Sequence, residues 1–357
     1  MMKQHIVVIG GYGHVGGHIS RMLGEKYPGL VYAAGRNLDR AQRFCRETGD
    51  KVKPMRFNRD AEADWDWLEQ TKLVIVCIDQ ENTVLAEACL ANGVNYLDIT
   101  ANGSFLTQLE RLNNGHYRGT GLLSVGLAPG LTNLLAQEAA KALDETIRIN
   151  IAIMLGLGDS HGKAAIEWTV DHLHSVFDVI EKGDIKKVSS FTDGRQTDFG
   201  GRLGYRTAYR FPFSDQATLP RTLEVPSVST RLCFDSRLAT FVIAGLRKSG
   251  AVRLLKKSVI REWTVKLLEL LKVGSAEYAV KVDAEGLKDG LHQAIGLSVY
   301  GENESLITAR VAFAAASALF TGTFPQGMYH LEQLFELERK EGSMYLKLKE
   351  TGERYII

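Results

Sequence analysis

A glycine-rich segment near the start of the chain has the residue types and spacing of a phosphate-binding loop. Residues 11–16 read Gly-Tyr-Gly-His-Val-Gly, the pattern G-x-G-x-x-G. They follow the β-branched run of residues 6–9 directly and open a segment with helical spacing of apolar residues. In this context the glycines permit a tight turn, a close approach of a pyrophosphate and close packing of helix on strand. The segment predicts a dinucleotide site; a glycine-rich turn without a ligand is the alternative.

The end of the next apolar run selects between NAD and NADP. NAD sites carry an Asp or Glu about 20 residues beyond the glycine motif, where it binds the ribose 2′-hydroxyl. Here Gly35-Arg36-Asn37 stand at that place, and Arg40 follows one turn later. A guanidinium can form a bidentate pair with a 2′-phosphate, whereas a carboxylate would repel it. We therefore predict NADP, with NAD less favoured; a solvated loop charge is the alternative for Arg36. Asp39 is expected to cap the following helix.

Two later apolar runs end in residues that an open α/β sheet would place in its ligand crevice. Cys77 and Ile78 end one run, and we expect them to line the cofactor. Asp98 and Ile99 end the next. Asp98 is predicted both to contact the cofactor and to act as an acid/base or orienting group; a loop cap is the alternative.

The turn at residues 126–130, Gly-Leu-Ala-Pro-Gly, joins a further apolar run to a helical segment. Its N–H groups could hold an amide or a carboxylate. A tight turn between domains is the alternative. The full set of predicted cofactor contacts is Gly11, Tyr12, Gly13, His14, Val15, Gly16, Arg36, Asn37, Arg40, Cys77, Ile78, Asp98, Ile99, Gly126 and Pro129.

Strands and helices that could position these residues alternate along the first 130 residues. Buried strands are predicted at 6–9, 30–34, 73–78, 96–99 and 122–125, with helices at 15–23, 39–48 and 83–92. Regular alternation implies right-handed crossovers. The fold class is therefore α/β, with an N-terminal Rossmann-type, doubly wound parallel sheet.

The remainder of the chain is predicted to form an α+β domain on a mainly antiparallel sheet. Isoleucines alternate with other residues over 147–155, which is typical of a strand buried on one face. Further strands are expected near 185–191, 227–234, 276–284 and 293–300, helices at 163–181, 237–248, 252–271, 306–320 and 328–340, and a hairpin connection at 285–290. We expect a dinucleotide domain at 1–130, completed by 306–357, and a substrate, catalytic and dimerisation domain at 131–305.

Composition and charge argue against several partners. The 357 residues include 43 Lys+Arg and 42 Asp+Glu, so no global basic field favours nucleic acid or an anionic membrane. The longest apolar run, 311–320, is too short to span a bilayer, and the chain enters a strand too early for a secretory signal. The four cysteines lack zinc spacing and are expected to be buried free thiols. We expect a cytoplasmic protein without a metal.

Four segments, in order, carry a resemblance to a known family. IVVIGGYGHVGGHISRMLGE, AAGRNLDRA, VIVCIDQENTVLAEACLANGVNYLDIT and SVGLAPGLTNLLA resemble the NADP-binding domain of the saccharopine dehydrogenase-like family. The segments AEGLKDG and TARVAFAAASALFTGTFPQGMYHLEQLF are similar to the family's closing hairpin and helices. Residues 156–275 show no matching motif, so the substrate does not carry over.

The resemblance implies a pyridine-nucleotide oxidoreductase that acts at a C–N bond, as in saccharopine reductase, lysine dehydrogenase and carboxynorspermidine synthase. It also implies cofactor contacts at Gly11, Gly13, Gly16, Arg36, Cys77, Ile78, Asp98 and Ile99. An amino-acid or imine substrate is expected, and a homodimer. A non-catalytic NADP-binding sensor or scaffold is the alternative from another class, and an NADP-dependent dehydrogenase of a sugar or an aldehyde is the rival enzyme.

Hydride transfer to an imine needs mainly proximity and orientation, so few side chains are demanded by the chemistry. An amino-acid substrate needs a carboxylate clamp, for which arginine is suited. The candidates are Arg202, Arg206, Arg210, Arg221 and Arg231. His161 is predicted as the acid/base group, with an ordinary loop histidine as the alternative.

Overall fold

The glycine-rich segment lies between the first strand and the first helix of the N-terminal unit. The computed structural model describes residues 3–58, 65–113, 117–159, 163–270 and 274–357. The chain divides into two units, one made of 1–131 with 306–357 and the other of 132–305. Each unit has its own central sheet.

The first unit is built on a seven-stranded sheet with the order β15-β6-β5-β4-β1-β2-β3, in which every strand pair is parallel. The strands are β1 (His5–Ile9), β2 (Val31–Gly35), β3 (Val52–Arg56), β4 (Thr71–Val76), β5 (Asn95–Asp98), β6 (Thr120–Leu123) and β15 (Gly327–His330). Their Val, Ile and Leu side chains are buried because helices cover both faces of the sheet. The predicted doubly wound parallel sheet is confirmed.

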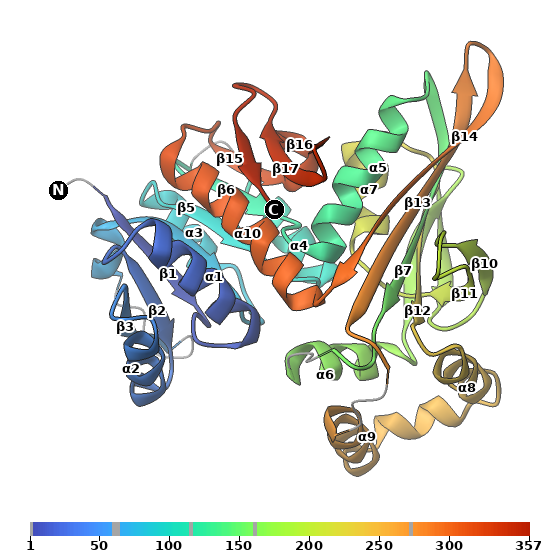
Figure 1. The fold of residues 1–357 in the computed structure, drawn as a ribbon, viewed down its shortest axis with the longest axis horizontal. Coiled ribbons are helices and arrows are strands. Elements are labelled where there is room, and N and C mark those ends of the chain that lie inside the picture. Colours follow the sequence, from blue (N-terminus) through green and yellow to red (C-terminus); the bar gives the residue numbers. More distant parts are fainter. Residues whose placement is uncertain (1–2, 59–64, 114–116, 160–162, 271–273) are drawn as a thin grey trace. The chain divides into compact units, whose positions relative to one another are not determined.

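Helices of the first unit follow the strands: α1 (His14–Lys26), α2 (Leu38–Glu47), α3 (Val84–Ala91), α4 (Gly103–Glu110) and α10 (Glu304–Thr321), with a 3-10 turn, η1, at Asp66–Glu69. α1 and α10 lie side by side (Figure 1), with the rings of Tyr27 and Phe320 4.8 Å apart. Among the described residues, only α10 has a length and hydropathy that would allow a membrane crossing, and 61% of its 18-residue window is buried. Burial of this kind is typical of a core helix.

For the first unit, one prediction is wrong and one strand was not predicted. Residues 328–340 do not form a helix: they contribute β15, the short helix α11 (Leu331–Leu334) and β16 (Phe335–Lys340). Phe335 and Leu337 alternate with charged residues, which suits the sheet that β16 forms with β17 (Ser343–Leu348) and β18 (Arg354–Ile356). The edge strand β3 was not predicted, because its proline and charged residues hide its pairing with β2.

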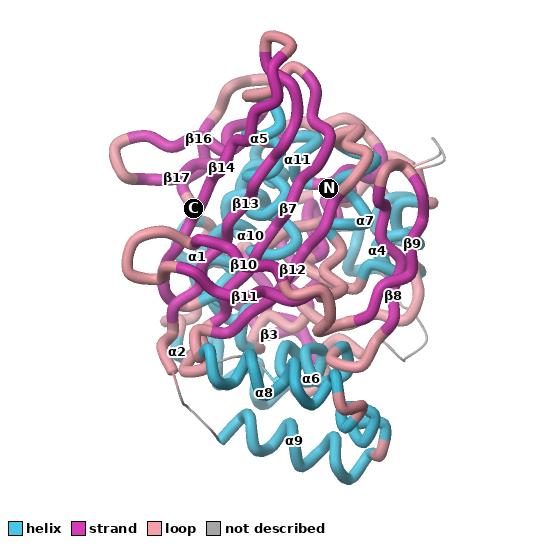
Figure 2. Tube along the Cα trace, turned by 90° about the vertical axis from the view of Figure 1, so that its right-hand side faces the viewer, coloured by secondary structure: helices cyan, strands magenta, loops and turns pink. Residues whose placement is uncertain are grey.

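The second unit is built on a six-stranded sheet with the order β10-β11-β12-β7-β13-β14. Its strands are β7 (Glu145–Leu155), β10 (Arg195–Asp198), β11 (Tyr205–Arg210), β12 (Val228–Phe234), β13 (Glu277–Lys288) and β14 (Leu291–Glu302). Only the pair β7 and β12 is parallel, so the predicted mainly antiparallel sheet is confirmed. Figure 2 looks onto this sheet, with β13, β7 and β12 side by side.

Helices and a small sheet complete the second unit: α5 (Thr132–Lys141), α6 (Lys163–His172), α7 (Asp215–Thr222), α8 (Arg237–Lys248), a 3-10 turn, η3 (Ala251–Lys256), α9 (Ser258–Leu270) and the hairpin of β8 (Val176–Glu181) with β9 (Asp184–Ser189). The prediction of one helix over 163–181 is wrong in its second half. The β-branched residues of β8 pair with β9 instead, across a turn at Lys182 and Gly183 where both residues have positive φ.

Two further expectations for the second unit need correction. The hairpin connection is shorter than 285–290, because β13 and β14 are paired up to a two-residue turn at Asp289 and Gly290. The strand β7 is buried on both faces in its middle: Ala152 and Met154, expected on an open face, lie under Phe199 and Leu203.

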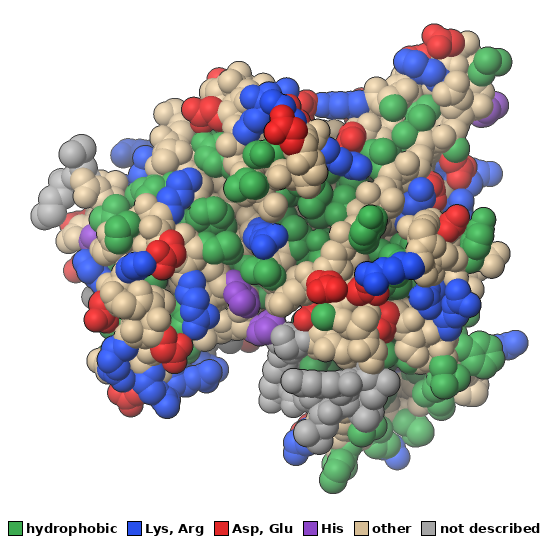
Figure 3. All heavy atoms as spheres, viewed as in Figure 1, with side chains coloured by type: hydrophobic (Ala, Val, Ile, Leu, Met, Phe, Trp, Pro, Cys, Tyr) green, Lys and Arg blue, Asp and Glu red, His purple; other side chains and the backbone are tan. Residues whose placement is uncertain are grey.

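On the face drawn in Figure 3, Lys/Arg and Asp/Glu side chains are interspersed, in keeping with a net charge of +1.

Candidate dinucleotide site

The glycine loop between β1 and α1 has a backbone that larger residues could not follow. A Cβ at Gly11 would lie 2.5 Å from the carbonyl oxygen of Val8, and one at Gly16 would collide with the carbonyl oxygen of Gly10. Gly10 has φ of +77°, the left-handed region that favours glycine. The first and third glycines of the motif are therefore fixed by the close approach of loop, strand and helix.

Gly13, the second glycine of the motif, is different because the protein itself does not fill the space beside it. A Cβ there would meet only the carbonyl oxygen of Gly10, at 3.0 Å, and the residue is exposed. Gly13 is also the N-cap of α1, which has neither a side-chain cap nor an acidic residue in its first turn. An uncapped helix start beside open space fits a pyrophosphate, which accepts hydrogen bonds from backbone N–H groups.

Tyr12 joins the glycine loop to the loop after β2. Its phenol oxygen accepts a hydrogen bond of 3.0 Å from the backbone N–H of Asn37. A Cβ at Gly35 would collide with the phenol, so glycine is required there. The Arg40 guanidinium carbon lies 5.6 Å from the centre of the Tyr12 ring. These contacts bring together three residues of the predicted site: Tyr12 on the glycine loop, and Asn37 and Arg40 at the start of α2.

Arg36 is the cation that this arrangement leaves available. Arg36 is exposed, and within the described part of the chain its side chain makes no ion pair or hydrogen bond. The neighbouring Asn37 has a local task, because its Oδ1 accepts a bond of 2.9 Å from the Arg40 N–H and so caps α2. The expectation that Asp39 caps this helix is wrong; Asp39 lies in the first turn.

Cys77 and Ile78 follow β4 and lie against the glycine loop. The Cys77 N–H donates to the carbonyl oxygen of Ile9, 2.9 Å away. A Cβ at Gly10 would come within 2.8 Å of Ile78 Cγ2. Burial, and after it the charge of Asp98, raises the pKa of the Cys77 thiol. The thiol is therefore protonated at neutral pH, and Cys77 contributes shape to the site rather than a nucleophile.

Asp98 is fully buried and both of its carboxylate oxygens accept hydrogen bonds. Oδ2 accepts from Tyr96 Oη at 2.5 Å and from Gln80 Nε2 at 2.9 Å, and Oδ1 accepts from the Thr100 N–H at 2.8 Å. Burial raises the pKa of Asp98 to about 6, although these hydrogen bonds oppose the shift. The arrangement fixes the loops after β4 and β5. The geometry matches the alternative interpretation, in which Asp98 caps a loop. The acid/base role of Asp98 remains a prediction.

The turn at residues 126–130 is buried and held from within the first unit. The Leu127 N–H donates to Thr308 Oγ1 at 3.2 Å, and the Leu131 N–H donates to the carbonyl oxygen of Gly126 at 2.8 Å. Gly126 and Pro129 are both buried, and Gly130 has φ of +135°. Their predicted contact with the cofactor stays a prediction.

The sequence interpretation missed a buried constellation of Ser124, His330 and Glu110. His330 Nδ1 lies 2.8 Å from Ser124 Oγ, and its Nε2 lies 2.9 Å from a Glu110 carboxylate oxygen. The order resembles a hydrolase triad, but Ser124 is completely buried, so no substrate can reach its oxygen. The three residues tie together α4, β15 and the turn after β6. No signal links them, since 206 positions separate Ser124 from His330.

The predicted carboxylate clamps fall into two groups in the second unit. Arg202, Arg206 and Arg221 are engaged locally, by Glu277, by the carbonyls of Leu203 and Asp235, and by the carbonyl of Ala217, respectively. Arg210 and Arg231 instead lie opposite each other on neighbouring strands, with buried side chains. His161 lies outside the described residues. Across those residues, no group of three or more His, Cys, Asp or Glu is arranged to hold a metal ion.

Comparisons with known proteins agree with this geometry. Residues 6–148 match the family model described as saccharopine dehydrogenase NADP binding domain. The match confirms the predicted resemblance for this part of the chain, and with it NADP as the cofactor. No curated protein matches by sequence.

Solved structures extend the likeness to the whole fold. Apo saccharopine dehydrogenase (L-Glu forming) from Saccharomyces cerevisiae is 13% identical, with a TM-score of 0.63 over 92% of this chain and 94% of that one. DAP dehydrogenase from C. glutamicum is 12% identical, with a TM-score of 0.44 over 93% and 94%. At such identities, the first likeness shows that the two-domain fold is shared.

Proposed function

Because residues 6–148 match the model of the saccharopine dehydrogenase NADP-binding domain, we propose that the chain is an NADP-dependent oxidoreductase acting at the C–N centre of an amino-acid or imine substrate. One observation carries the dinucleotide part of the proposal. The Tyr12 bond to Asn37 holds the loop that bears the unpaired Arg36 beside the uncapped start of α1. A cation and a helix N-terminus together are suited to the two phosphate groups of NADP.

Each part of the site has a distinct task in this proposal. The N–H groups around Gly13 and the first turn of α1 bind the pyrophosphate, and Arg36 pairs with the 2′-phosphate. Arg40, stacked over Tyr12, adds a second positive charge. Cys77 and Ile78 supply apolar contact beside the loop, and Asp98 positions the loops that carry Gln80 and Thr100. The nicotinamide, when bound, supplies or accepts the hydride, so the chain's own residues need to bind, orient and exclude water.

The C–N specificity is supported by the family match and by the shared fold with a saccharopine dehydrogenase. Two rivals lead to different measurements. A non-catalytic sensor or scaffold would bind NADPH without turnover. An NADP-dependent sugar or aldehyde dehydrogenase would reduce NADP with those substrates and ignore mixtures of amine and keto acid.

The test is a turnover assay with the purified full-length chain. NADPH oxidation is followed at 340 nm with a panel of α-keto acids, each mixed with an amino acid or a polyamine. In parallel, reduction of NADP is followed at the same wavelength with sugars and aldehydes. We expect oxidation that requires both the carbonyl compound and the amine. Binding of NADPH without turnover over the whole panel would favour the sensor, and turnover of a sugar or aldehyde alone would favour the rival enzyme.

We also propose that the protein is a cytoplasmic homodimer, with the second unit as the dimerisation domain. Size-exclusion chromatography with light scattering should give twice the mass of 39.5 kDa. A monomer at micromolar concentration would contradict the dimer and leave the proposed chemistry untouched.

A further inference from the structure

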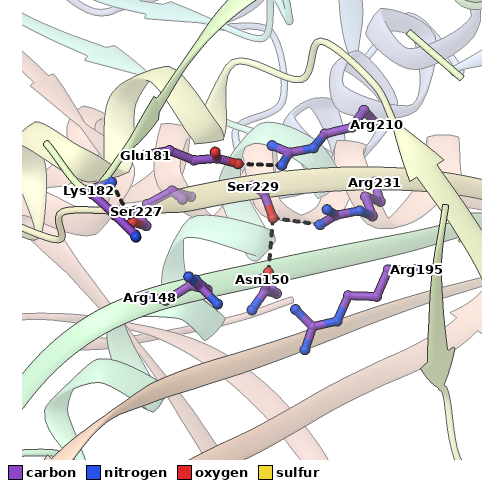
Figure 4. Close-up of a pocket in the computed structure, with 10 residues that line it drawn as sticks. Arg148, Asn150, Glu181, Lys182, Arg195, Arg210, Ser227, Ser229 and Arg231 are labelled. Carbon is purple, nitrogen blue, oxygen red and sulfur yellow. Dashed lines mark hydrogen bonds and ion pairs between the residues drawn. The ribbon is translucent and has the colours of Figure 1, made fainter. Parts of the chain in front are cut away.

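A cavity of about 200 Å³ lies on one face of the sheet of the second unit, around the parallel strands β7 and β12. Its lining includes Arg148 and Asn150 from β7, Arg195 from β10, Arg210 from β11, Arg231 from β12 and Lys182 from the β8–β9 turn. Figure 4 shows these side chains gathered about the cavity. All of them belong to the second unit, whereas the glycine loop belongs to the first.

Strand register explains why one face collects these side chains. Asn150 pairs with Ser229 across the parallel pair, and Arg231 pairs with Arg210 across the antiparallel one. Residues paired in register share a face, because side chains alternate with a period of two. The face is further connected by a hydrogen bond of 3.0 Å from Ser229 Oγ to Asn150 Oδ1, drawn in Figure 4.

Positive charge exceeds negative charge at the cavity. The five cations Arg148, Lys182, Arg195, Arg210 and Arg231 line it together with one carboxylate, Glu181. Two more carboxylates, Asp193 and Glu285, pair with these cations from beside the lining. Five cations therefore face three acids, and the surplus is available to a bound anion.

Two of the arginines are buried, and one of them, Arg210, is only partly satisfied. The side chains of Arg210 and Arg231 are 6% and 7% exposed, and Asp193 Oδ2 bridges them at 2.8 and 2.7 Å. Arg210 also donates to Glu181 at 2.5 Å, yet its Nη1 is buried without a hydrogen-bond partner. A buried guanidinium nitrogen without an acceptor is costly, so the protein alone does not fully satisfy the Arg210 guanidinium. Burial, together with the charge of Arg210, also lowers the pKa of Arg231, which an anion would reverse.

The other three cations are held loosely enough to turn toward a ligand. Arg195 and Arg148 share one carboxylate, Glu285, at the long distances of 3.4 and 3.8 Å. The Lys182 side chain makes no ion pair or hydrogen bond within the described part of the chain, and only its backbone N–H is engaged, by Ser227 Oγ. Two buried arginines together with weakly paired cations suit the binding of an anion.

We propose that this cavity binds a small divalent oxyanion, a phosphate group or a short dicarboxylate, in addition to the NADP site. The planar forks of the arginines match two oxygens of either group, and Asn150 supplies a neutral donor through its Nδ2. The small volume of the cavity suits a ligand of about the size of succinate.

The test is isothermal titration calorimetry on the full chain saturated with NADPH, so that the dinucleotide site is already filled. Sodium phosphate and sodium succinate are titrated separately, and sodium chloride at equal ionic strength is the reference. We expect one molecule of phosphate or succinate bound per chain, and no saturable heat with chloride. The oxyanion that binds more tightly identifies the source.

Variants locate the bound anion. Lys182→Gln and Arg148→Ala alter exposed or half-exposed side chains that the fold does not depend on, and each should weaken binding about tenfold. Lys187→Gln is the matched control, because Lys187 lies on β9 with a 79% exposed side chain and outside the lining. NADPH affinity should be unchanged in all three. At a phosphate concentration near the wild-type Kd, the melting temperature should rise more for the wild type and Lys187→Gln than for Lys182→Gln and Arg148→Ala.

Two results would overturn the proposal. One is that phosphate and succinate give no more heat than chloride. The other is that Lys182→Gln and Lys187→Gln weaken binding equally, which would make the effect one of general charge. Either result leaves NADPH binding and turnover untouched, so it would be distinguishable from a failure of the proposed oxidoreductase function.

Discussion

The phenol oxygen of Tyr12 lies 3.0 Å from the backbone nitrogen of Asn37 and accepts its hydrogen bond. Tyr12 is the variable residue between two glycines of the motif, and Asn37 caps the helix after the second strand. The bond therefore couples the loop that approaches the pyrophosphate to the loop that chooses between NADP and NAD. Four substitutions test this site and the buried residues of the same unit.

Arg36→Ala should weaken NADPH and leave NADH almost unchanged, because only NADPH carries the 2′-phosphate that the guanidinium would pair with. Loss of a charged, bidentate contact corresponds to a decrease in NADPH affinity of roughly 10- to 100-fold. Fluorescence titration of both nucleotides measures the ratio. Arg43→Ala is the control, since Arg43 is exposed on α2, the helix that follows Arg36, and makes no ion pair within the described residues. Equal NADPH affinity of wild type and Arg36→Ala would refute the assigned role.

Tyr12→Phe should weaken NADPH by roughly three- to tenfold, because it removes the acceptor of the Asn37 N–H without changing the ring. The loop then loses its fixed position beside α1, whereas thermal stability should change little because the lost hydrogen bond is exposed to solvent. Tyr32→Phe is the matched control, since the Tyr32 hydroxyl has no hydrogen bond in the part of the chain that the structure describes. If both variants bind NADPH as the wild type does, the hydrogen bond between Tyr12 and Asn37 has no function in binding.

Asp98→Asn should become relatively more favourable as pH rises. Burial raises the pKa of Asp98 from its ordinary value of 3.8 to about 6. A raised pKa means that the folded state holds the proton more tightly, so this contribution to stability is complete below about pH 4 and is lost as pH rises through 6. The difference in free energy of unfolding between wild type and Asp98→Asn should therefore fall by at most about 3 kcal/mol over that range.

Urea unfolding of both proteins between pH 4 and 7.5 measures this difference. The variant keeps an acceptor for Thr100 but replaces the oxygen that accepts from Tyr96 and Gln80 by an NH2 group. That change lowers stability by an amount that does not titrate, so the pH dependence of the difference reports the ionisation of Asp98. A wild type that gains on the variant with rising pH would show that the three hydrogen bonds outweigh burial.

His330→Ala should destabilise the first unit by about 2–4 kcal/mol, because it leaves a cavity and deprives both Ser124 and Glu110 of a partner. Thermal and urea unfolding give the value. His292→Ala on the exposed part of β14 is the control and should change stability by less than about 0.5 kcal/mol. An equal, small effect of both substitutions would show that the buried constellation does not contribute to stability.

Much of the first unit could be predicted because its signals are local. The β-branched run before Gly10 and the glycines themselves are readable in one dimension, since each answers a requirement of its own backbone segment. Arg36 was also identifiable, by its distance along the chain from the motif. Asn37 was assigned to the cofactor and Asp39 to the cap, whereas Asn37 is the cap; two polar residues so close together compete for the same N–H groups.

Less of the second unit could be predicted because its strands pair with strands that are far away in the sequence. Residues 176–181 have side chains that suit either a helix or a strand, and the partner strand β9 decided between them. Arg210 and Arg231 were candidates as an anion clamp among five arginines, but Arg148, Arg195 and Lys182 were not considered with them. Their proximity depends on strand order and register, which no local spacing reveals.

The sequence by itself determined that the chain begins with an NADP-binding, doubly wound sheet, because the glycine loop and Arg36 act through residues within one βαβ segment. Only the tertiary structure decided which side chains from separate parts of the sequence come into contact. It brought Gln80 to Asp98, joined Ser124 to His330 across 206 positions, and gathered five cations around one cavity. Local backbone requirements are written in neighbouring residues, whereas proximity in space depends on the whole fold.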